Sequence, residues 1–399
     1  MGRLPPVPVD AGYIVPLLPL LKWAHADATR DVGIDVVLAE LIAGLAHCGV
    51  PVARANLTLP TLHPQFAAAS AIWRDNGAHE FHQRRWTGMA SQAFQESPVK
   101  SLLAGTETQV HQSLETQGQL PWPVLDDFRS QGFTDYLGLS IPGDHTPNLL
   151  TLTTRAPGGF QPEHLRVLEL VVQALRPTLQ LHVLRTIARN ICQTYIGPVT
   201  GPLVLSGAIR RGSVESLDAV VWFCALRGFT ALSEALGSQE MVTLLNAFFG
   251  AITASIEDHQ GEILKFIGDA ALAIFPVRRP QDLPAACTQA LGAARQAIDG
   301  IEALNDRRRE AGQRRLEFGI GLNVGEVSYG NIGGADRLDF TVIGPAVNLA
   351  SRLEGLCASL DEPLVASEHF AAALPGSLRS LGLHSFKGVR DPVAVFGLV

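Results

Sequence analysis

The sequence predicts an α+β protein built from two folded domains. Residues 31–186 follow the order helix, strands, long helix that is typical of an α/β sandwich, and residues 215–399 alternate strands with helices. Glycine and proline residues cluster between these two blocks, so we expect a domain boundary there. A length of 399 residues fits two or three domains.

The composition excludes several classes of protein. Apolar residues make up 47% of the chain and charged residues 17%, which is enough for sizeable cores and excludes a disordered chain. The formal net charge of −7 argues against binding of nucleic acid or of an anionic membrane through bulk charge. The five cysteines show no metal-ligand spacing and no CxxC motif, which favours a reducing, cytoplasmic environment.

The best candidate for a membrane span is the apolar stretch YIVPLLPLLKWA at residues 13–24. It is too short to cross a bilayer and contains Pro16, Pro19 and Lys22, so we expect no transmembrane segment. We expect residues 1–30 to form an extended arm that packs on a folded domain.

The first domain begins with a helix and continues with strands. Apolar residues at helical spacing predict a helix over 35–46, and Gly49 marks its end. Alternating residues predict a strand over 52–60 and two more strands within 137–154.

A long helix is expected over residues 160–190, with a kink at Pro177. It leads into a helical linker and transducer over 187–214. The helix is long enough to pair with its copy in a second chain.

The layout of residues 31–186 resembles that of a GAF-type sensor domain. The resemblance implies a regulatory domain with a ligand that the sequence does not identify. A packing domain without a ligand is the alternative. Five side chains could line a pocket or could be ordinary packing residues: His63, Trp73, His79, His82 and Trp86.

The second domain has more elements. Strands are expected over 218–226, 316–333 and 338–344, and a hairpin over 261–276. One or two helices are expected over 230–260, and further helices over 283–312 and 345–356.

Five motifs occur in order in this second domain. They are FCALRGFTALSE at 223–234, GEILKFIGDAALAIF at 261–275, GLNVGEVSYGNIG at 321–333, RLDFTVIGPAVNLASRLEGL at 337–356, and FKGVRDPVAVF near the end. With these motifs, residues 215–399 resemble the class III nucleotide cyclase catalytic domain. The resemblance implies a ferredoxin-like fold and the conversion of a nucleoside triphosphate to a 3′,5′-cyclic nucleotide and pyrophosphate.

The resemblance also implies how metal and phosphate are bound. Asp269, in the hairpin turn, matches a metal-binding aspartate, and the family holds two Mg²⁺ or Mn²⁺ ions per site, for which carboxylate oxygens are suitable ligands. Gly228, Phe229 and Thr230 lie where a strand meets a helix, so their N–H groups could hold phosphate. Lys387 matches a lysine that reaches the triphosphate.

Two further pairs match residues that act on the nucleoside. Asn348 and Arg352 are four residues apart on one helix face, and in the family they orient the ribose and stabilise the transition state. Lys265 and Thr341 match the pair that selects the base. A lysine can donate to N1 of adenine and a threonine hydroxyl can accept from its 6-amino group, so ATP is favoured over GTP.

Ala225 departs from the family pattern, which has a metal-binding aspartate at this position. A methyl group cannot bind Mg²⁺, and Cys224 cannot replace it because successive strand residues point to opposite faces. Pro345 also replaces the usual Asp or Asn.

We therefore expect an adenylate cyclase of intracellular signalling whose activity Ala225 impairs. The alternative is a catalytically inactive cyclase-fold protein that binds nucleotide or a partner and signals by conformation. A guanylate cyclase is a third possibility, which the base-selecting pair disfavours. Family sites form between two catalytic domains and this chain carries both sets of residues in one block, so a head-to-tail homodimer with shared sites is expected.

Overall fold

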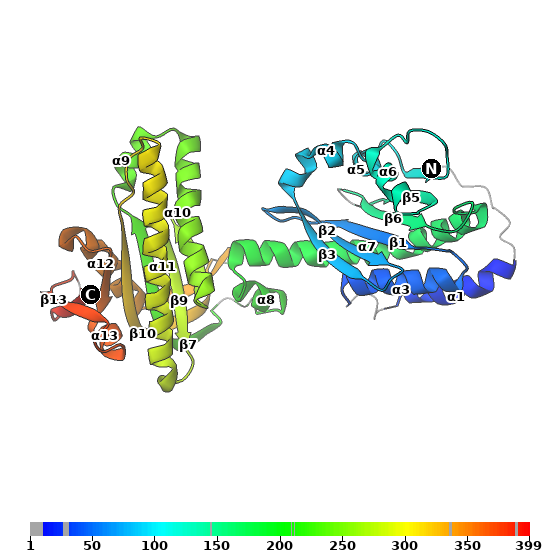
Figure 1. Ribbon diagram of the computed structural model, residues 1–399. Coiled ribbons are helices and arrows are strands. Elements are labelled where there is room, and N and C mark those ends of the chain that lie inside the picture. The colour runs from blue at the N-terminus through cyan, green and yellow to red at the C-terminus, as the bar shows by residue number, and fades with distance from the viewer. Residues whose placement is uncertain are drawn as a thin grey trace. The chain divides into compact units, whose positions relative to one another are not determined.

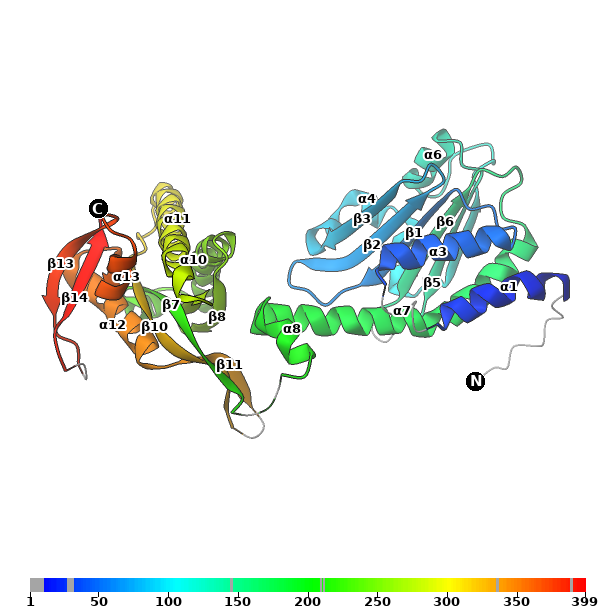
Figure 2. The same ribbon diagram turned by 90° about the horizontal axis from the view of Figure 1, so that it is seen from below.

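The computed structural model describes residues 11–26, 32–143, 146–208, 210, 212–334, 337–387 and 390–399. The chain divides into two compact units, Met1–Ile191 and Cys192–Val399. Each unit combines helices with a sheet that is wholly or largely antiparallel, as expected for an α+β protein (Figures 1 and 2). The division between the units falls within the segment predicted as a linker.

The N-terminal sheet has six antiparallel strands in the order β3-β2-β1-β6-β5-β4. The strands are β1 (Arg54–Pro60), β2 (Phe66–Arg74), β3 (His79–Arg85), β4 (Gln109–Ser113), β5 (Asp135–Ile141) and β6 (Asn148–Thr154). The helices are α1 (Ala11–Ala24), α3 (Ile34–His47), the 3₁₀ turn η1 (Trp86–Ala90), α4 (Gln92–Gln95), α5 (Pro98–Ala104), α6 (Pro123–Ser130) and α7 (Pro162–Ile196). The helices and strands that the sequence predicted for this unit are confirmed.

Alternate residues of these strands face two separate cores. Leu57 of β1 and Leu152 of β6 pack with helices α1, α3 and α7. Tyr136 of β5 and Leu149 of β6 pack instead with α5 and α6. Because strand side chains alternate between faces, the sheet lies between two helical layers.

The predicted extended arm is wrong, because the segment forms helix α1 despite Pro16 and Pro19. Leu20 and Ala24 are buried in the N-terminal core, and their spacing places them on one side of a helix. The carbonyl of Ala24 accepts a hydrogen bond of 2.5 Å from Thr178 Oγ1 on α7. Burial of this apolar face therefore stabilises a helix that the two prolines disfavour.

The residues considered for a sensor pocket lie at the surface or in packing positions. His79 and His82 are exposed on the edge strand β3, and Trp73 packs against the N-terminal core. Trp86 is exposed, and its indole N–H donates to the carbonyl of His63 at 2.9 Å. Their placement favours the interpretation as ordinary packing and surface residues.

The C-terminal sheet has eight strands, of which seven follow the order β13-β14-β12-β10-β7-β9-β8, and β11 pairs with β10. The strands are β7 (Val214–Leu226), β8 (Glu262–Ile267), β9 (Ala270–Val277), β10 (Phe318–Gly333), β11 (Leu338–Ile343), β12 (Leu364–Ser367), β13 (Leu378–His384) and β14 (Val393–Leu398). Only β10 and β12 are parallel among the described strand pairs. The helices are α8 (Thr200–Leu205), α9 (Phe229–Ala235), α10 (Ser238–Asp258), the 3₁₀ turn η2 (Pro280–Asp282), α11 (Leu283–Glu310), α12 (Pro345–Leu360) and α13 (Glu368–Ala373).

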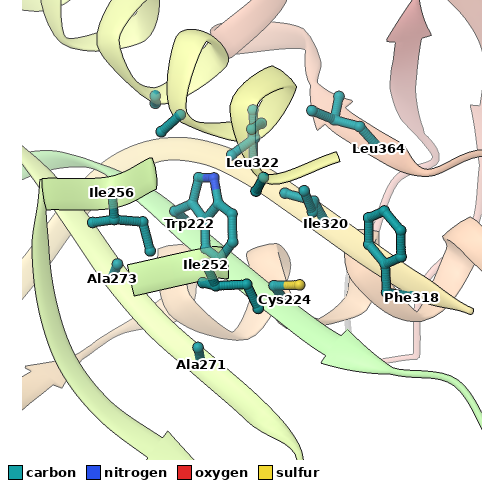
Figure 3. Close-up of a cluster of buried hydrophobic side chains, with 14 of the residues drawn as sticks. Trp222, Cys224, Ile252, Ile256, Ala271, Ala273, Phe318, Ile320, Leu322 and Leu364 are labelled. Carbon is teal, nitrogen blue, oxygen red and sulfur yellow. The ribbon is translucent and has the colours of Figure 1, made fainter. Parts of the chain in front are cut away.

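Strand β7 runs through the middle of this sheet, and its side chains alternate between two cores. Trp222 and Cys224 point toward helices α10 and α11, where they pack with Ile252 (Figure 3). Val221 packs with Ala350 of helix α12 on the opposite face. The residue after Cys224 therefore faces α12.

The predicted hairpin, the long helix after it and the helix beginning at Pro345 are all present in the C-terminal unit. Helices α10 and α11 lie side by side against the sheet (Figures 1 and 2). Within the described ranges, no helix is both long and apolar enough to cross a membrane.

Candidate active site

Asp269 lies in the tight turn that joins β8 to β9. The preceding Gly268 has a φ of 63°, a left-handed conformation that favours glycine. The N–H of Leu226, at the end of β7, donates to the carbonyl of Asp269 at 3.4 Å. Because Ala225 of β7 pairs with Ala270 of β9, Asp269 and position 225 are neighbours, as two residues of one site must be.

Position 225 supplies no ligand atom, and its neighbour does not compensate. Cys224 is fully buried in the core under α10 and α11, and this burial raises the pKa of its thiol well above the usual value. A neutral thiol on the opposite face of the strand is unsuited to a hard cation. Cys224 therefore cannot replace a carboxylate at position 225, as the alternation of strand side chains predicted.

The predicted phosphate-binding turn lies where β7 meets α9. Gly228 has a φ of 66° and occupies the position before the first helical residue, Phe229. Gly228 and Thr230 are exposed, whereas the Phe229 ring packs against the C-terminal core. The prediction concerns the backbone N–H groups of all three residues, and it stays a prediction.

Helix α12 has one buried face and one outward face. Ala346, Ala350 and Leu353 are buried against the sheet. Asn348 is exposed and Arg352 is partly exposed. The two predicted nucleoside-contacting residues therefore share one face of the helix and point away from their own sheet.

An ion pair connects the strands that carry Lys265 (β8) and Thr341 (β11). Lys265 Nζ forms an ion pair of 3.5 Å with Asp339 Oδ2, and Asp339 is two residues before Thr341 on the same face of β11. Thr341 is 3% exposed, and its hydroxyl has no hydrogen-bond partner among the described residues. A buried hydroxyl without a partner is unusual, so it marks a position where a ligand could complete the bonding.

The structure does not bring all candidate residues together. In the part of the chain that is described, three groups of candidate residues are not connected by any hydrogen bond or ion pair. The groups are Asp269, the pair Lys265 and Thr341, and the outward face of α12. Lys387 is exposed after β13 and makes no such contact with the others either. The candidate residues therefore form groups that no such contact joins within the described part of one chain.

Two charged residues beside Asp269 were not identified from the sequence. Arg227 follows β7, and its Nη2 donates to the carbonyl of Glu362 at 2.6 Å, while its buried Nε has no partner among the described residues. Glu354 on α12 is half-buried; burial raises its pKa to about 7, Arg227 lowers it and Asp269 raises it. The only sequence signal for these residues was charge within the matched motifs.

The donor set limits which metal site the chain can form. Carboxylate oxygens suit Mg²⁺ and Mn²⁺, and Asp269 supplies them. Across the described segments, no group of three or more His, Cys, Asp or Glu side chains is arranged to hold a metal ion. A single divalent cation shared between Asp269 and the phosphate oxygens of a nucleotide fits these residues, whereas two cations bridged by carboxylates at positions 225 and 269 do not.

Comparisons with known proteins concern the C-terminal unit. Residues 213–366 match the family model of the adenylate and guanylate cyclase catalytic domain. An adenylate cyclase of Anabaena cylindrica is 37% identical over 152 residues, which are 37% of this chain and 29% of that protein. Adenylate cyclase 1 of Rhizobium meliloti is 28% identical over 186 residues, which are 46% of this chain and 27% of that protein.

The comparisons extend to solved structures. The adenylyl cyclase CyaB of P. aeruginosa is 28% identical, with a TM-score of 0.43 over 47% of this chain and 96% of that chain. The curated relatives above are much longer than the region they share, since the alignments span less than a third of their length. The matched segment begins after the N-terminal unit and ends before Lys387.

Proposed function

Because residues 213–366 form a class III adenylate and guanylate cyclase catalytic domain, we propose that this chain converts ATP to 3′,5′-cyclic AMP and pyrophosphate. The observation that supports ATP most directly is the buried Thr341 hydroxyl without a partner, close to Lys265. The adenine 6-amino group would donate to that hydroxyl, and N1 would accept from the lysine. The two relatives named above as adenylate cyclases agree with this choice.

The chemistry is an in-line displacement at phosphorus. The ribose 3′-oxygen attacks the α-phosphorus and loses its proton to solvent, and the bond to the bridging oxygen of pyrophosphate breaks. Negative charge develops on the phosphoryl oxygens, where the Arg352 guanidinium would stabilise it, and Asn348 would hold the ribose. The backbone N–H groups of Gly228, Phe229 and Thr230, and the ammonium of Lys387, would bind the triphosphate.

A homodimer would assemble these separate groups. Asn348 and Arg352 point away from their own sheet. Their outward position supports the proposal that they act on a nucleotide held by a second chain. We propose head-to-tail dimers in which one chain contributes Asp269 and the other contributes Lys265, Thr341 and the outward face of α12. A closed dimer of this kind contains two equivalent sites.

A divalent cation would neutralise phosphate charge and activate the attacking oxygen when bound. Asp269 would hold it. With Ala225 in place of a second carboxylate, the proposed reaction is slow, because one electrostatic group commonly contributes on the order of 10²–10³ in rate.

Ala225 also favours a second candidate function. A chain that binds ATP at an otherwise complete site without turning it over would signal through conformation. Measurement of product decides between the two, since only the enzyme forms cyclic AMP.

The N-terminal unit is proposed to regulate the catalytic unit, as its GAF-like layout suggested. Its six-stranded sheet between two helical layers supports a separate folded module. The ligand that it would sense is not specified by any described residue.

The experiment uses the purified full chain with ATP or GTP and with Mg²⁺ or Mn²⁺. We expect cyclic AMP from ATP and tighter binding of ATP than of GTP in competition. The double variant Lys265→Glu and Thr341→Cys should shift relative affinity toward GTP by roughly 5- to 150-fold, the cost of one unpaired buried polar group. The control Lys100→Glu makes the same charge change at an exposed site of the N-terminal unit and should leave the preference unchanged. Equal affinity for ATP and GTP in the unmodified chain would contradict the proposal.

A further inference from the structure

Glu354 is a half-buried carboxylate to which the proposed function assigns no role. It lies on the buried side of α12, two residues after Arg352, and a separation of two residues turns a side chain to the other side of a helix. Among the described residues, no hydrogen bond or ion pair reaches its carboxylate. A half-buried acid without a partner requires an explanation.

Two glycines of β10 bring this carboxylate against the sheet. A Cβ atom on Gly319 would lie 2.9 Å from Glu354 Oε1, and a Cβ atom on Gly321 would lie 2.1 Å from the carbonyl oxygen of Ala350. Any side chain at either position would push α12 away. The absence of side chains there lets the helix approach and places the acid directly on the strand.

The strand register then places the acid beside the position that lacks a carboxylate. Gly319 of β10 is paired directly with Ala225 of β7. Side chains of residues paired in this way share one face of the sheet, with Cβ atoms about 4.5–5.5 Å apart. The Glu354 carboxylate therefore lies next to the Ala225 methyl group, on the face where an aspartate at 225 would project.

Two charged residues act on this acid. Arg227 is near enough to attract it, and Asp269 repels it more weakly. The guanidinium of Arg227 donates instead to the carbonyl of Glu362. The Asp269 backbone and the Glu354 carboxylate both lie near position 225. A divalent cation bound by both carboxylates would offset the repulsion between them.

We propose that Glu354 is the second carboxylate ligand of a divalent cation held by Asp269, in place of the ligand that Ala225 cannot supply. The proposal rests on the proposed function, because it concerns the same nucleotide site. Nucleotide phosphate oxygens and water would complete the oxygen shell. Helix α12 would then serve two sites: Glu354 acts in its own chain, and Asn348 and Arg352 act in the site of the second chain.

The test measures Mn²⁺ binding and does not depend on turnover. Electron paramagnetic resonance of free Mn²⁺ is recorded with the full chain and 3′-deoxy-ATP, which lacks the attacking hydroxyl. We expect Glu354→Gln to weaken Mn²⁺ binding at least about tenfold, and Asp269→Asn to weaken it similarly. The control Glu257→Gln removes an exposed carboxylate of α10 and should bind like the unmodified chain.

Two further variants show whether weaker Mn²⁺ binding results from the loss of a ligand or from misfolding. Adding Ala225→Asp to Glu354→Gln returns a carboxylate to the same face and should restore Mn²⁺ affinity. Glu354→Asp keeps the charge on a shorter side chain and should bind with intermediate affinity. Thermal unfolding of each variant shows whether the fold is kept.

The outcomes separate this inference from the proposed function. If Glu354→Gln binds Mn²⁺ like the unmodified chain while Asp269→Asn does not, Glu354 is not a ligand and the role of Asp269 stands. If Asp269→Asn also binds normally, the cation is not held at this turn and both assignments fail.

Discussion

At the scale of single residues, Ala225 is a methyl group at the point where the end of β7, the β8–β9 turn and helix α12 meet. The backbone of Asp269 is held at the strand end, and Glu354 lies on the facing helix. The substitution Ala225→Asp would therefore give three carboxylates here, together with those of Asp269 and Glu354.

Ala225→Asp should raise cyclic AMP formation at least roughly 10²-fold, because it adds a charged ligand for a second cation without changing the rest of the site. In the control Ala225→Asn, the new side chain has nearly the same volume as aspartate but carries no charge. This control should give no comparable rise in cyclic AMP formation. Initial rates of cyclic AMP formation measure the effect. An unmodified chain as fast as the aspartate variant would refute the account of the metal site.

His111 should make the stability of the N-terminal unit depend on pH. Its Nε2 lies 2.7 Å from Oδ2 of the buried Asp135, which also accepts from the N–H of Phe160, and the bond to Asp135 raises the pKa of His111. Since the folded pKa lies above the unfolded value of about 6.5, the stabilisation is complete below that pH. It is lost as the pH rises through the raised pKa.

Thermal unfolding between about pH 5.5 and 8.5 would show this loss. His111→Gln should flatten the dependence, and the control His79→Gln, on the exposed edge strand, should not. An unchanged pH dependence in His111→Gln would exclude this pair as its source.

The sequence predicted the candidate site residues to which the family pattern assigns a role, and it missed those whose place in the site depends on contacts between elements. Asp269 and Lys265 could be found because the hairpin motif fixes both. Asp339 and Glu354 could not, because their importance depends on an ion pair from β11 to β8 and on the approach of α12 to β10. Such contacts have no periodic signal along the chain.

At the scale of elements, most helices and strands could be predicted because hydrophobic periodicity and glycine or proline boundaries agree with the final structure. Helix α1 is the exception. Its prolines argue locally against a helix, whereas its buried side argues for one only once α3 and α7 are in place. Tertiary packing therefore determines that α1 is helical, and local helix propensity does not contain this information.

Leu20→Ala should loosen helix α1. The Leu20 side chain is 5% exposed and contacts α3 at Gly44, so its loss should lower the free energy of opening of α1 by about 2–5 kcal/mol. Hydrogen exchange of the α1 amides measures this free energy.

The control Leu18→Ala truncates a side chain that is 48% exposed on the same helix, and it should change the exchange little. Equal effects of the two substitutions would show that α1 does not depend on its buried side.

At the scale of the whole molecule, two folded units share one chain. In the C-terminal unit, no hydrogen bond or ion pair among the described residues joins the groups of candidate site residues. In the proposed dimer, the site would be complete only when two catalytic units meet. If the N-terminal unit is regulatory, as proposed, it would act by changing how these units meet.

The most direct test of the shared-site account mixes two inactive chains. Both carry Ala225→Asp to raise the signal; one also carries Asp269→Ala, and the other carries Arg352→Ala. Both lesions fall in the same site of a mixed dimer, so its other site is intact. Random mixing should therefore restore about a quarter of the activity of the Ala225→Asp parent. Activity no higher than that of the separate chains, with mixed dimers confirmed by mass spectrometry, would contradict a cyclase site shared between two chains.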